Sequence, residues 1–172
     1  RGMNRFAHNG MTRRVIGGHW IWSPRMQQMA RDNEIEAYIL PGGVIMQLMR
    51  EVAAGRPGLI THVGLGTFVD PRQDGGRLNQ AAKADLTELI SIDGREYIRY
   101  LPIPISVALL RGSYADEDGN ISLEEEPANL DIYAMAAAAH NTGGKVIFQV
   151  KGKVPRNSLK AREVRIPGAL VD

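Results

Sequence analysis

The sequence predicts an α/β fold with a mainly parallel sheet, flanking helices and one antiparallel hairpin excursion. In the first part of the chain, short apolar runs alternate with segments of helical periodicity, which is the pattern of βαβ units. Glycine-containing turns separate each run from the segment that follows it. Later, two strand-like segments flank an Asp-Gly pair, a combination typical of a β-hairpin.

The first predicted unit is a strand over 13–16 followed by a helix. Ser23-Pro24 combines an N-cap residue with proline at the first helical position, which favours a helix start there. We expect this helix to continue to Asp32, and alternation over 35–40 predicts the next strand.

The second unit repeats the same order. Pro41-Gly42-Gly43 ends the strand, Gly55 ends the following helix, and a third apolar run covers 59–63. The apolar residues of this helix share one stripe at helical spacing, and they are Val44, Ile45, Leu48, Met49 and Val52.

The second part of the chain predicts antiparallel strands and one buried helix. The hairpin consists of 86–92, the turn Asp93-Gly94 and 95–101, and a further strand covers 103–110. The remaining elements are a turn at 116–120, a short strand to Leu123, an alanine-rich helix over 130–140 with Gly143-Gly144 as its C-terminal stop, and a strand over 145–150. No boundary is visible, so residues 1–172 are predicted to form a single domain.

Three turns would lie at one edge of the predicted parallel sheet. They are Gly17-Gly18-His19, Pro41-Gly42-Gly43 and Gly64-Leu65-Gly66. In such sheets ligands bind outside the carboxyl ends of the strands. This edge is therefore the strongest indication of a site from the residues alone.

Composition excludes several classes of function. The 172 residues are 44% hydrophobic and 23% charged with a net charge of +2, which is ordinary globular composition without a polybasic arm. We therefore do not expect nucleic acid as a partner. No apolar stretch approaches the roughly 20 residues needed to span a bilayer, so we do not expect a membrane partner either. The absence of cysteine removes thiolate nucleophiles, disulfides and cysteine-ligated metals, and it is compatible with a cytoplasmic protein.

The segment Gly64-Leu65-Gly66-Thr67-Phe68 follows an apolar run, and its glycines would let backbone N–H groups approach an anion or a thioester oxygen. A dinucleotide fingerprint would need a third glycine and an uninterrupted helix, which Pro71 precludes. A plain structural loop is the alternative reading of this segment.

The four histidines lack metal-ligand spacing, and no metal site is predicted. His19 differs from the others because it lies in a glycine turn at the predicted edge. A nucleophile elbow of the G-x-S-x-G type is absent, so a hydrolase triad has no support.

Four motifs occur along the chain in the order VIGGHW (15–20), THVGLGTFVDPRQDGG (61–76), RGSYADEDGNIS (111–122) and IPGALVD (166–172). In sequence and order they closely resemble the α-part of family I CoA-transferases of the acetate/propionate type. The resemblance spans nearly the whole chain.

This resemblance implies a two-part homo-oligomeric enzyme with acyl-CoA and carboxylic acid substrates and no cofactor beyond coenzyme A as substrate. In the family a glutamate of the β-part attacks the thioester, and CoA then returns to form a glutamyl-CoA thioester. Glu117-Asp118-Gly119 is the one lookalike here, but Ser122 replaces the next glycine of the Glu-x-Gly-x-x-Gly setting. We therefore expect Glu117 to be a turn residue, no catalytic residue in this chain, and the chain to be a later section of the α-part, inactive by itself.

One departure affects the predicted pocket. The family commonly has Pro-Gln-Gly where this chain has Pro41-Gly42-Gly43. Gly42 cannot point an amide into the acyl pocket, so acyl preference is left open. Two other functions also stay open, a non-enzymatic sugar-phosphate sensor of the same fold class and an acyl-CoA hydrolase. The predicted acyl/CoA pocket consists of Gly17, Gly18, His19, Gly42, Gly43, Gly64, Leu65, Gly66, Thr67 and Phe68.

Overall fold

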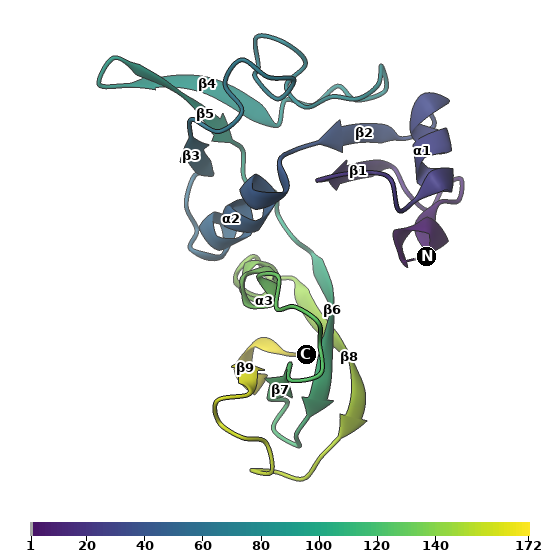
Figure 1. Ribbon diagram of the computed structural model, residues 1–172, viewed down its shortest axis with the longest axis vertical. Helices are drawn as coiled ribbons and strands as arrows, with labels where there is room; N and C mark the ends of the chain where they lie inside the picture. Colours follow the sequence, from purple (N-terminus) through teal and green to yellow (C-terminus); the bar gives the residue numbers. More distant parts are fainter. Residues whose placement is uncertain (1) are drawn as a thin grey trace. The chain divides into compact units, whose positions relative to one another are not determined.

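The computed structural model describes residues 2–172, which form two compact units (Figure 1). The first unit consists of residues 2–48 and Gly58–Leu101, and the second consists of Met49–Pro57 and Pro102–Asp172. The prediction of a single domain stays a prediction, because compact units of one chain can still belong to one domain.

The first unit contains the predicted βαβ arrangement. After a short 3-10 helix η1 (Gly2–Phe6), strand β1 (Arg14–Gly17) leads through helix α1 (Pro24–Arg31) to strand β2 (Glu36–Ile39). The two strands pair in parallel over their full length. α1 starts with proline as predicted, and it buries its apolar side chains against the strand pair. This core consists of Ala7, Met26, Met29, Ala30, Ile35 and Ala37.

Helix α2 (Gly42–Ala53) begins two residues earlier than the apolar stripe suggested. The carbonyl of Pro41 accepts the first helical hydrogen bond, from the Ile45 N–H at 3.0 Å. Gly42 and Gly43 therefore form the first turn of the helix and not a separate loop. The sequence did not indicate this helix start, because glycine has a low helix propensity although it can adopt a helical backbone.

The second sheet of this unit is antiparallel, with the order β3-β5-β4. It consists of β3 (Leu59–Thr61), β4 (Thr87–Ile92) and β5 (Arg95–Tyr100). The predicted hairpin is confirmed, and its turn residues Asp93 and Gly94 have φ values of 50° and 75°. Two positive φ values in succession are the requirement of a tight turn that matches strand twist.

β3 is thus not a third strand of the β1–β2 sheet, as the repeated pattern had suggested. The outer edge of β2 is already occupied by residues 76–78. Ile39 donates its N–H to the Gly76 carbonyl at 2.8 Å, and Leu78 donates to the Ala37 carbonyl at 2.9 Å. Because residues 76–78 occupy this edge of β2, its backbone hydrogen-bonding groups are not available to pair with β3.

The second unit is built on a four-stranded mixed sheet with the order β8-β6-β7-β9. β6 and β8 are parallel, whereas β7 is antiparallel to both of its neighbours. The strand expected over 103–110 starts later and runs further, and β9 was not predicted. The elements are β6 (Val107–Ala115), β7 (Ile121–Ser122), α3 (Ile132–Asn141), β8 (Lys145–Lys153), β9 (Val164–Ile166) and the 3-10 helix η2 (Gly168–Leu170).

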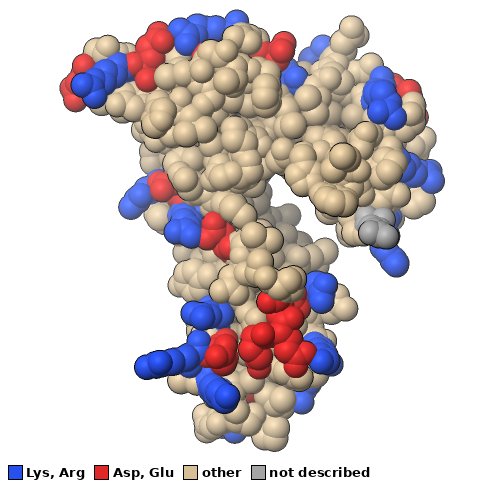
Figure 2. Space-filling view, in the orientation of Figure 1, with Lys and Arg blue, Asp and Glu red and all other residues tan. Residues whose placement is uncertain are grey.

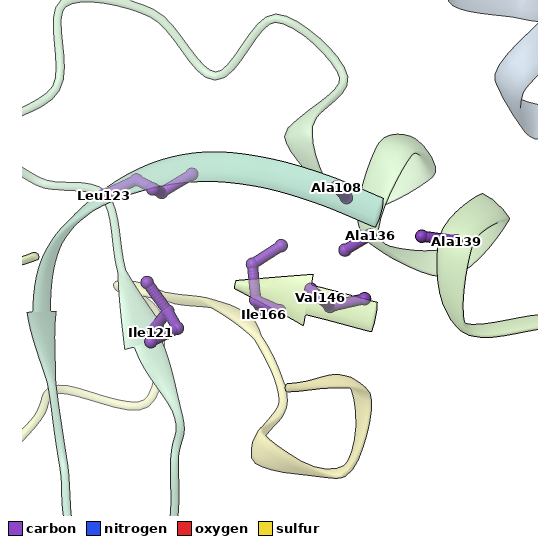
Figure 3. Close-up of a cluster of buried hydrophobic side chains, with 7 residues drawn as sticks. All are labelled: Ala108, Ile121, Leu123, Ala136, Ala139, Val146 and Ile166. Atoms are coloured by element: carbon purple, nitrogen blue, oxygen red, sulfur yellow. The ribbon is translucent and has the colours of Figure 1, made fainter. Parts of the chain in front are cut away.

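α3 packs on one face of this sheet through small side chains (Figure 1). Ala136 and Ala139 are fully buried, which confirms the prediction of a buried alanine-rich helix. Alanine allows a close approach of helix to sheet, so the space is filled by aliphatic side chains from the strands. Figure 3 shows the cluster of Ala108, Ile121, Leu123, Ala136, Ala139, Val146 and Ile166.

Charges of both signs are interspersed on the face of the second unit visible in Figure 2. Arg111 pairs with Glu126 at 3.3 Å, and Lys151 pairs with Glu125. Glu125 also accepts a hydrogen bond from the Tyr114 hydroxyl at 2.6 Å. The run Glu124-Glu125-Glu126 is therefore partly neutralised by neighbouring strands.

Two successive glycines end α3 in different surroundings. Gly143 has a φ of +77° with open space around it, whereas a Cβ on Gly144 would lie 2.3 Å from the Ile105 carbonyl oxygen. Gly143→Ala should cost roughly 1 kcal/mol because of its left-handed backbone. Gly144→Ala should cost more than about 2 kcal/mol because it drives a methyl group into backbone. Urea unfolding measures both, and equal losses would contradict the close approach at Gly144.

Candidate functional site

The first two predicted turns meet at the carboxyl edge of the β1–β2 pair. The Gly17 carbonyl accepts the Leu40 N–H at 3.1 Å. A Cβ on Gly18 would lie 3.2 Å from the Gly42 Cα. Since two backbones pass this closely, only glycine fits at Gly18 without movement.

Gly42 and Gly43 present an open helix start. A Cβ at either position would have nothing within 4 Å, and neither has a positive φ. The N–H groups of Gly42, Gly43 and Val44 have no acceptor within residues 2–172. Such N–H groups carry the positive end of the helix dipole and favour a negative charge or a polarised oxygen.

His19 lies on the surface beside a tryptophan. Its Nε2 accepts a hydrogen bond from Trp22 Nε1 at 3.1 Å, and the two rings meet edge to face. Trp20 Nε1 donates to the Tyr38 carbonyl at 3.2 Å and fixes the turn against β2. The predicted site residue His19 is therefore oriented by Trp22.

The third predicted turn belongs to a loop, residues 62–76, which we call the β3 loop. This loop is attached to the end of β2 by two successive hydrogen bonds. Gly76 donates its N–H to the Phe68 carbonyl at 2.9 Å, and its own carbonyl accepts the Ile39 N–H at 2.8 Å. The turn 64–68 is thus tied to β2, although β3 lies in a different sheet.

A buried carboxylate organises the β3 loop. The Asp70 side chain is 1% exposed and receives the Gly66 N–H at 2.8 Å and the Arg72 N–H at 3.0 Å. The Arg72 guanidinium adds a two-pronged contact, with Nε and Nη2 at 3.0 and 2.8 Å from the two carboxylate oxygens. Bidentate pairs of this kind are strong and fix geometry.

Three pKa values are shifted in and around this ion pair. The hydrogen bonds from the Arg72 side chain and the Gly66 N–H hold the pKa of the Asp70 carboxyl well below its usual range. The pKa of Arg72 is raised by its contacts with Asp70 and with Glu96, whose carboxylate lies 3.0 Å away. Burial, followed by the charge of Asp70, raises the pKa of Tyr100 to about 12. The Asp70 carboxylate is therefore fully ionised at neutral pH.

The loop uses most of its own N–H groups internally. Those of Leu65, Gly66 and Thr67 donate to the His62 carbonyl, the Asp70 carboxylate and the Gly64 carbonyl. Gly66 is therefore not free to stabilise an oxyanion with its N–H group. The N–H groups of Gly64 and Phe68 have no acceptor among the described residues, so they are the available donors.

The two loop glycines serve different needs. A Cβ on Gly64, which has a φ of +102°, would lie 2.4 Å from Val69 Cγ2 and 2.5 Å from the Tyr100 hydroxyl. Gly66, with a φ of +72°, has open space around it. Beside this opening the Phe68 side chain is 47% exposed. The loop thus presents an apolar ring and an unobstructed glycine on a rigid base.

Sequence reasoning overlooked Asp70 and Arg72. The only signal was a charged residue placed directly after the apolar Val69 in a glycine-rich loop. No group of three or more His, Cys, Asp or Glu side chains suited to a metal ion occurs within residues 2–172. Over the same residues, no helix has the length and apolar character needed to cross a membrane.

Comparison with known proteins matches the whole chain, residues 1–172, to the family model described as Coenzyme A transferase. The chain belongs to the coenzyme A transferase family. The resemblance of the four motifs is thereby confirmed.

Three relatives illustrate this membership. Caffeate CoA-transferase of Acetobacterium woodii is 47% identical over 172 residues, all of this chain and 33% of that protein. Acetate CoA-transferase YdiF of Escherichia coli O157:H7 is 43% identical over the same span, 32% of its length. Acetoacetyl-CoA:acetate/butyrate CoA transferase alpha subunit of Clostridium acetobutylicum is 28% identical over 171 residues, which cover 70% of it.

A crystal structure of the YdiF acyl-CoA transferase as a thioester complex with CoA superposes with a TM-score of 0.97. The alignment covers all of this chain and 34% of that chain. This member of the coenzyme A transferase family therefore spans about a third of the first two relatives, with the same backbone course as the corresponding part of YdiF.

The buried pair makes stability depend on pH. Asp70→Asn should lower the free energy of unfolding by about 2–4 kcal/mol at neutral pH, because Arg72 and the Gly66 N–H lose a charged acceptor. The folded-state pKa of Asp70 is depressed, so its stabilisation is complete above the unfolded pKa of about 4 and is lost as pH falls toward the folded value.

Urea unfolding of both proteins between about pH 7 and pH 3 measures this effect. The gap between wild type and Asp70→Asn should be constant at the upper end and should narrow below about pH 4. A gap that stays constant to the lowest pH would mean that the Asp70 charge does not stabilise the fold.

Proposed function

We propose that this chain is part of an acyl-CoA:carboxylate CoA-transferase, which moves CoA between an acyl-CoA and a free short-chain carboxylic acid. One observation carries the proposal. The chain is 43% identical over its whole length to an acetate CoA-transferase, and it follows the backbone of that protein's CoA thioester complex with a TM-score of 0.97. The chain corresponds to about a third of that relative, so the activity is proposed for a longer protein that contains it.

The reaction needs a carboxylate nucleophile, which we place outside this chain. A glutamate attacks the acyl carbonyl and expels CoA thiolate, which gives a mixed anhydride. The thiolate then attacks the glutamyl carbonyl and releases the first acid, leaving a glutamyl-CoA thioester. The second carboxylate repeats the sequence in reverse and regenerates the glutamate, so no net proton transfer is required.

Glu117 is a poor candidate for this nucleophile. It is exposed within the tight turn between β6 and β7. Asp116 holds that turn by accepting the N–H groups of Asp118 and Asn120 at 3.0 and 2.9 Å. A catalytic nucleophile needs an environment that excludes water and fixes its orientation. An exposed turn does neither.

The role of this chain would be to shape the acyl pocket and to present N–H donors. Polarised donors stabilise the oxyanion that forms when a thioester carbonyl is attacked. The N–H groups of Gly64 and Phe68 and the open first turn of α2 are suited to this task, whereas Gly66 leaves space for the acyl group. Coenzyme A is a substrate in this proposal.

We also infer that the β-part carrying the glutamate is a necessary partner and that the enzyme works in the cytoplasm as a homo-oligomer. One relative is itself named as an alpha subunit, which supports a division into an α-part and a further part. The family match does not favour a sugar-phosphate sensor. An acyl-CoA hydrolase, which would use the same glutamate with water as acceptor, is the one competing function that the experiment below must distinguish.

Thioester trapping in the full-length protein tests the proposal. After incubation with acetyl-CoA or propionyl-CoA, borohydride should reduce a single glutamyl-CoA thioester outside residues 1–172, and CoA should pass to an added carboxylate. The isolated 172-residue chain serves as the control and should transfer nothing. Thioester formation with release of free CoA but no transfer would indicate the hydrolase, and an adduct on Glu117 would overturn the assignment of the nucleophile.

Gly42 offers a test of acyl preference. Gly42→Gln is compatible with the backbone, since Gly42 has no positive φ and a Cβ there meets nothing within 4 Å. Gly42 is exposed, so the added amide would lose its water only when an acyl group binds over it. Burial of that amide without a partner costs roughly 1–3 kcal/mol, so the ratio of kcat/KM for a hydroxyacyl-CoA over butyryl-CoA should rise about fivefold or more.

Gly42→Ala is the matched control, because it changes the helix start without adding an amide. Its kcat/KM ratio should equal that of the wild type. If the glutamine variant is folded and its ratio is also unchanged, Gly42 does not face the acyl group.

A further inference from the structure

Asp70 forms hydrogen bonds through its carboxylate, its carbonyl and its N–H group. Besides its four carboxylate contacts, its carbonyl accepts the N–H groups of Gln73 and Gly75 at 2.9 and 3.1 Å. Its own N–H donates to the Thr67 carbonyl at 2.9 Å. One residue thus joins both halves of the β3 loop, from the glycine turn to the segment that returns to β2.

The carboxylate also determines which N–H groups the turn leaves open. By accepting the Gly66 N–H, it keeps that group inside the loop. The Gln73 side-chain amide donates a hydrogen bond to the carbonyl of the same residue, Gly66, at 3.0 Å. Both polar groups of Gly66 are therefore satisfied within the loop, whereas the N–H of the neighbouring Phe68 is not.

Arg72 extends this arrangement to the antiparallel sheet. Its Nε and Nη2 donate hydrogen bonds to the Asp70 carboxylate. Its Nη1 lies 3.1 and 3.0 Å from the two carboxylate oxygens of Glu96 on β5. A guanidinium held by two carboxylates has little rotational freedom. The loop is therefore held to β2 through Gly76, and Arg72 adds a surface ion pair with Glu96 of β5.

We propose that Asp70, supported by Arg72, is a positioning residue of the acyl pocket: it holds the Gly64–Phe68 turn so that the N–H and ring of Phe68 remain available to the acyl-CoA. This inference rests on the proposed function. Asp70 does not touch the substrate. It acts through the turn that it holds. If the turn shifts, its N–H donors shift too, and a displacement of about 1 Å in a donor can lower turnover by up to about a hundredfold.

Asp116 provides a matched control for the purely structural part of this role. It is 8% exposed and likewise accepts two backbone N–H groups and a side-chain amide, Nδ2 of Asn120 at 2.9 Å. Asp116 also holds a glycine-containing turn, but that turn contains none of the predicted pocket residues. Asn at either position removes the charge and keeps the shape.

The experiment compares Asp70→Asn and Asp116→Asn in the full-length enzyme. Three quantities are measured: the Tm, the fraction of molecules with a borohydride-trappable glutamyl thioester, and turnover per trappable molecule. Both variants should lower the Tm. Turnover per trappable molecule should fall roughly 10- to 100-fold in Asp70→Asn and should match the wild type in Asp116→Asn.

Graded variants keep the test valid if Asp70→Asn does not fold. Arg72→Lys retains the charge but loses the two-pronged geometry, so turnover per trappable molecule should fall by an intermediate factor. Glu96→Gln removes only the exposed contact of Arg72 and should change turnover less than twofold, as expected for a surface ion pair.

Wild-type turnover per trappable molecule in both Asp70→Asn and Arg72→Lys would overturn the positioning role and leave the proposed function intact. Wild-type enzyme without any trappable thioester would overturn the proposed function, and this role with it. The two failures are therefore distinguishable in one set of measurements.

Discussion

The buried ion pair between Asp70 and Arg72 is the interaction on which the candidate site depends. A carboxylate that is 1% exposed is tolerated because two backbone N–H groups and a guanidinium fork replace its water. The same contacts decide the shape of the β3 loop. Without these contacts, the Gly66 N–H and Arg72 would both need new acceptors. The turn would then no longer be held in the conformation that leaves Phe68 exposed.

Close backbone approach is the second constraint, and glycine satisfies it at different places in different ways. Gly18 allows β1 to end against the first turn of α2, and Gly64 allows the loop to pack against Val69 and Tyr100. Gly76 links the loop to β2 through the Ile39 N–H. These three glycines hold turns from two sheets of the first unit in fixed positions. A site formed by those turns would need such fixed positions.

Local signals were read correctly from the sequence, whereas contacts between distant segments were not. Ser23-Pro24 marked the start of α1, and Asp93-Gly94 marked the hairpin, because helix caps and tight turns depend on a few adjacent residues. β3 was placed in the wrong sheet because the return of residues 76–78 to β2 is set by contacts about forty positions apart in the chain. The motifs identified the family, but no pattern revealed that Asp70 takes the Gly66 N–H.

Hydrogen exchange at the amides of the β3 loop in the full-length protein tests this account most directly. The account predicts slow exchange of the Gly66 N–H, which the buried Asp70 carboxylate holds, and fast exchange of the Phe68 N–H, which has no acceptor within the described residues. In Asp70→Asn the Gly66 N–H should exchange faster, while amides of β6 and β8 should be unchanged. Equally fast exchange of the Gly66 and Phe68 amides in the wild type would contradict the claim that Asp70 holds the loop.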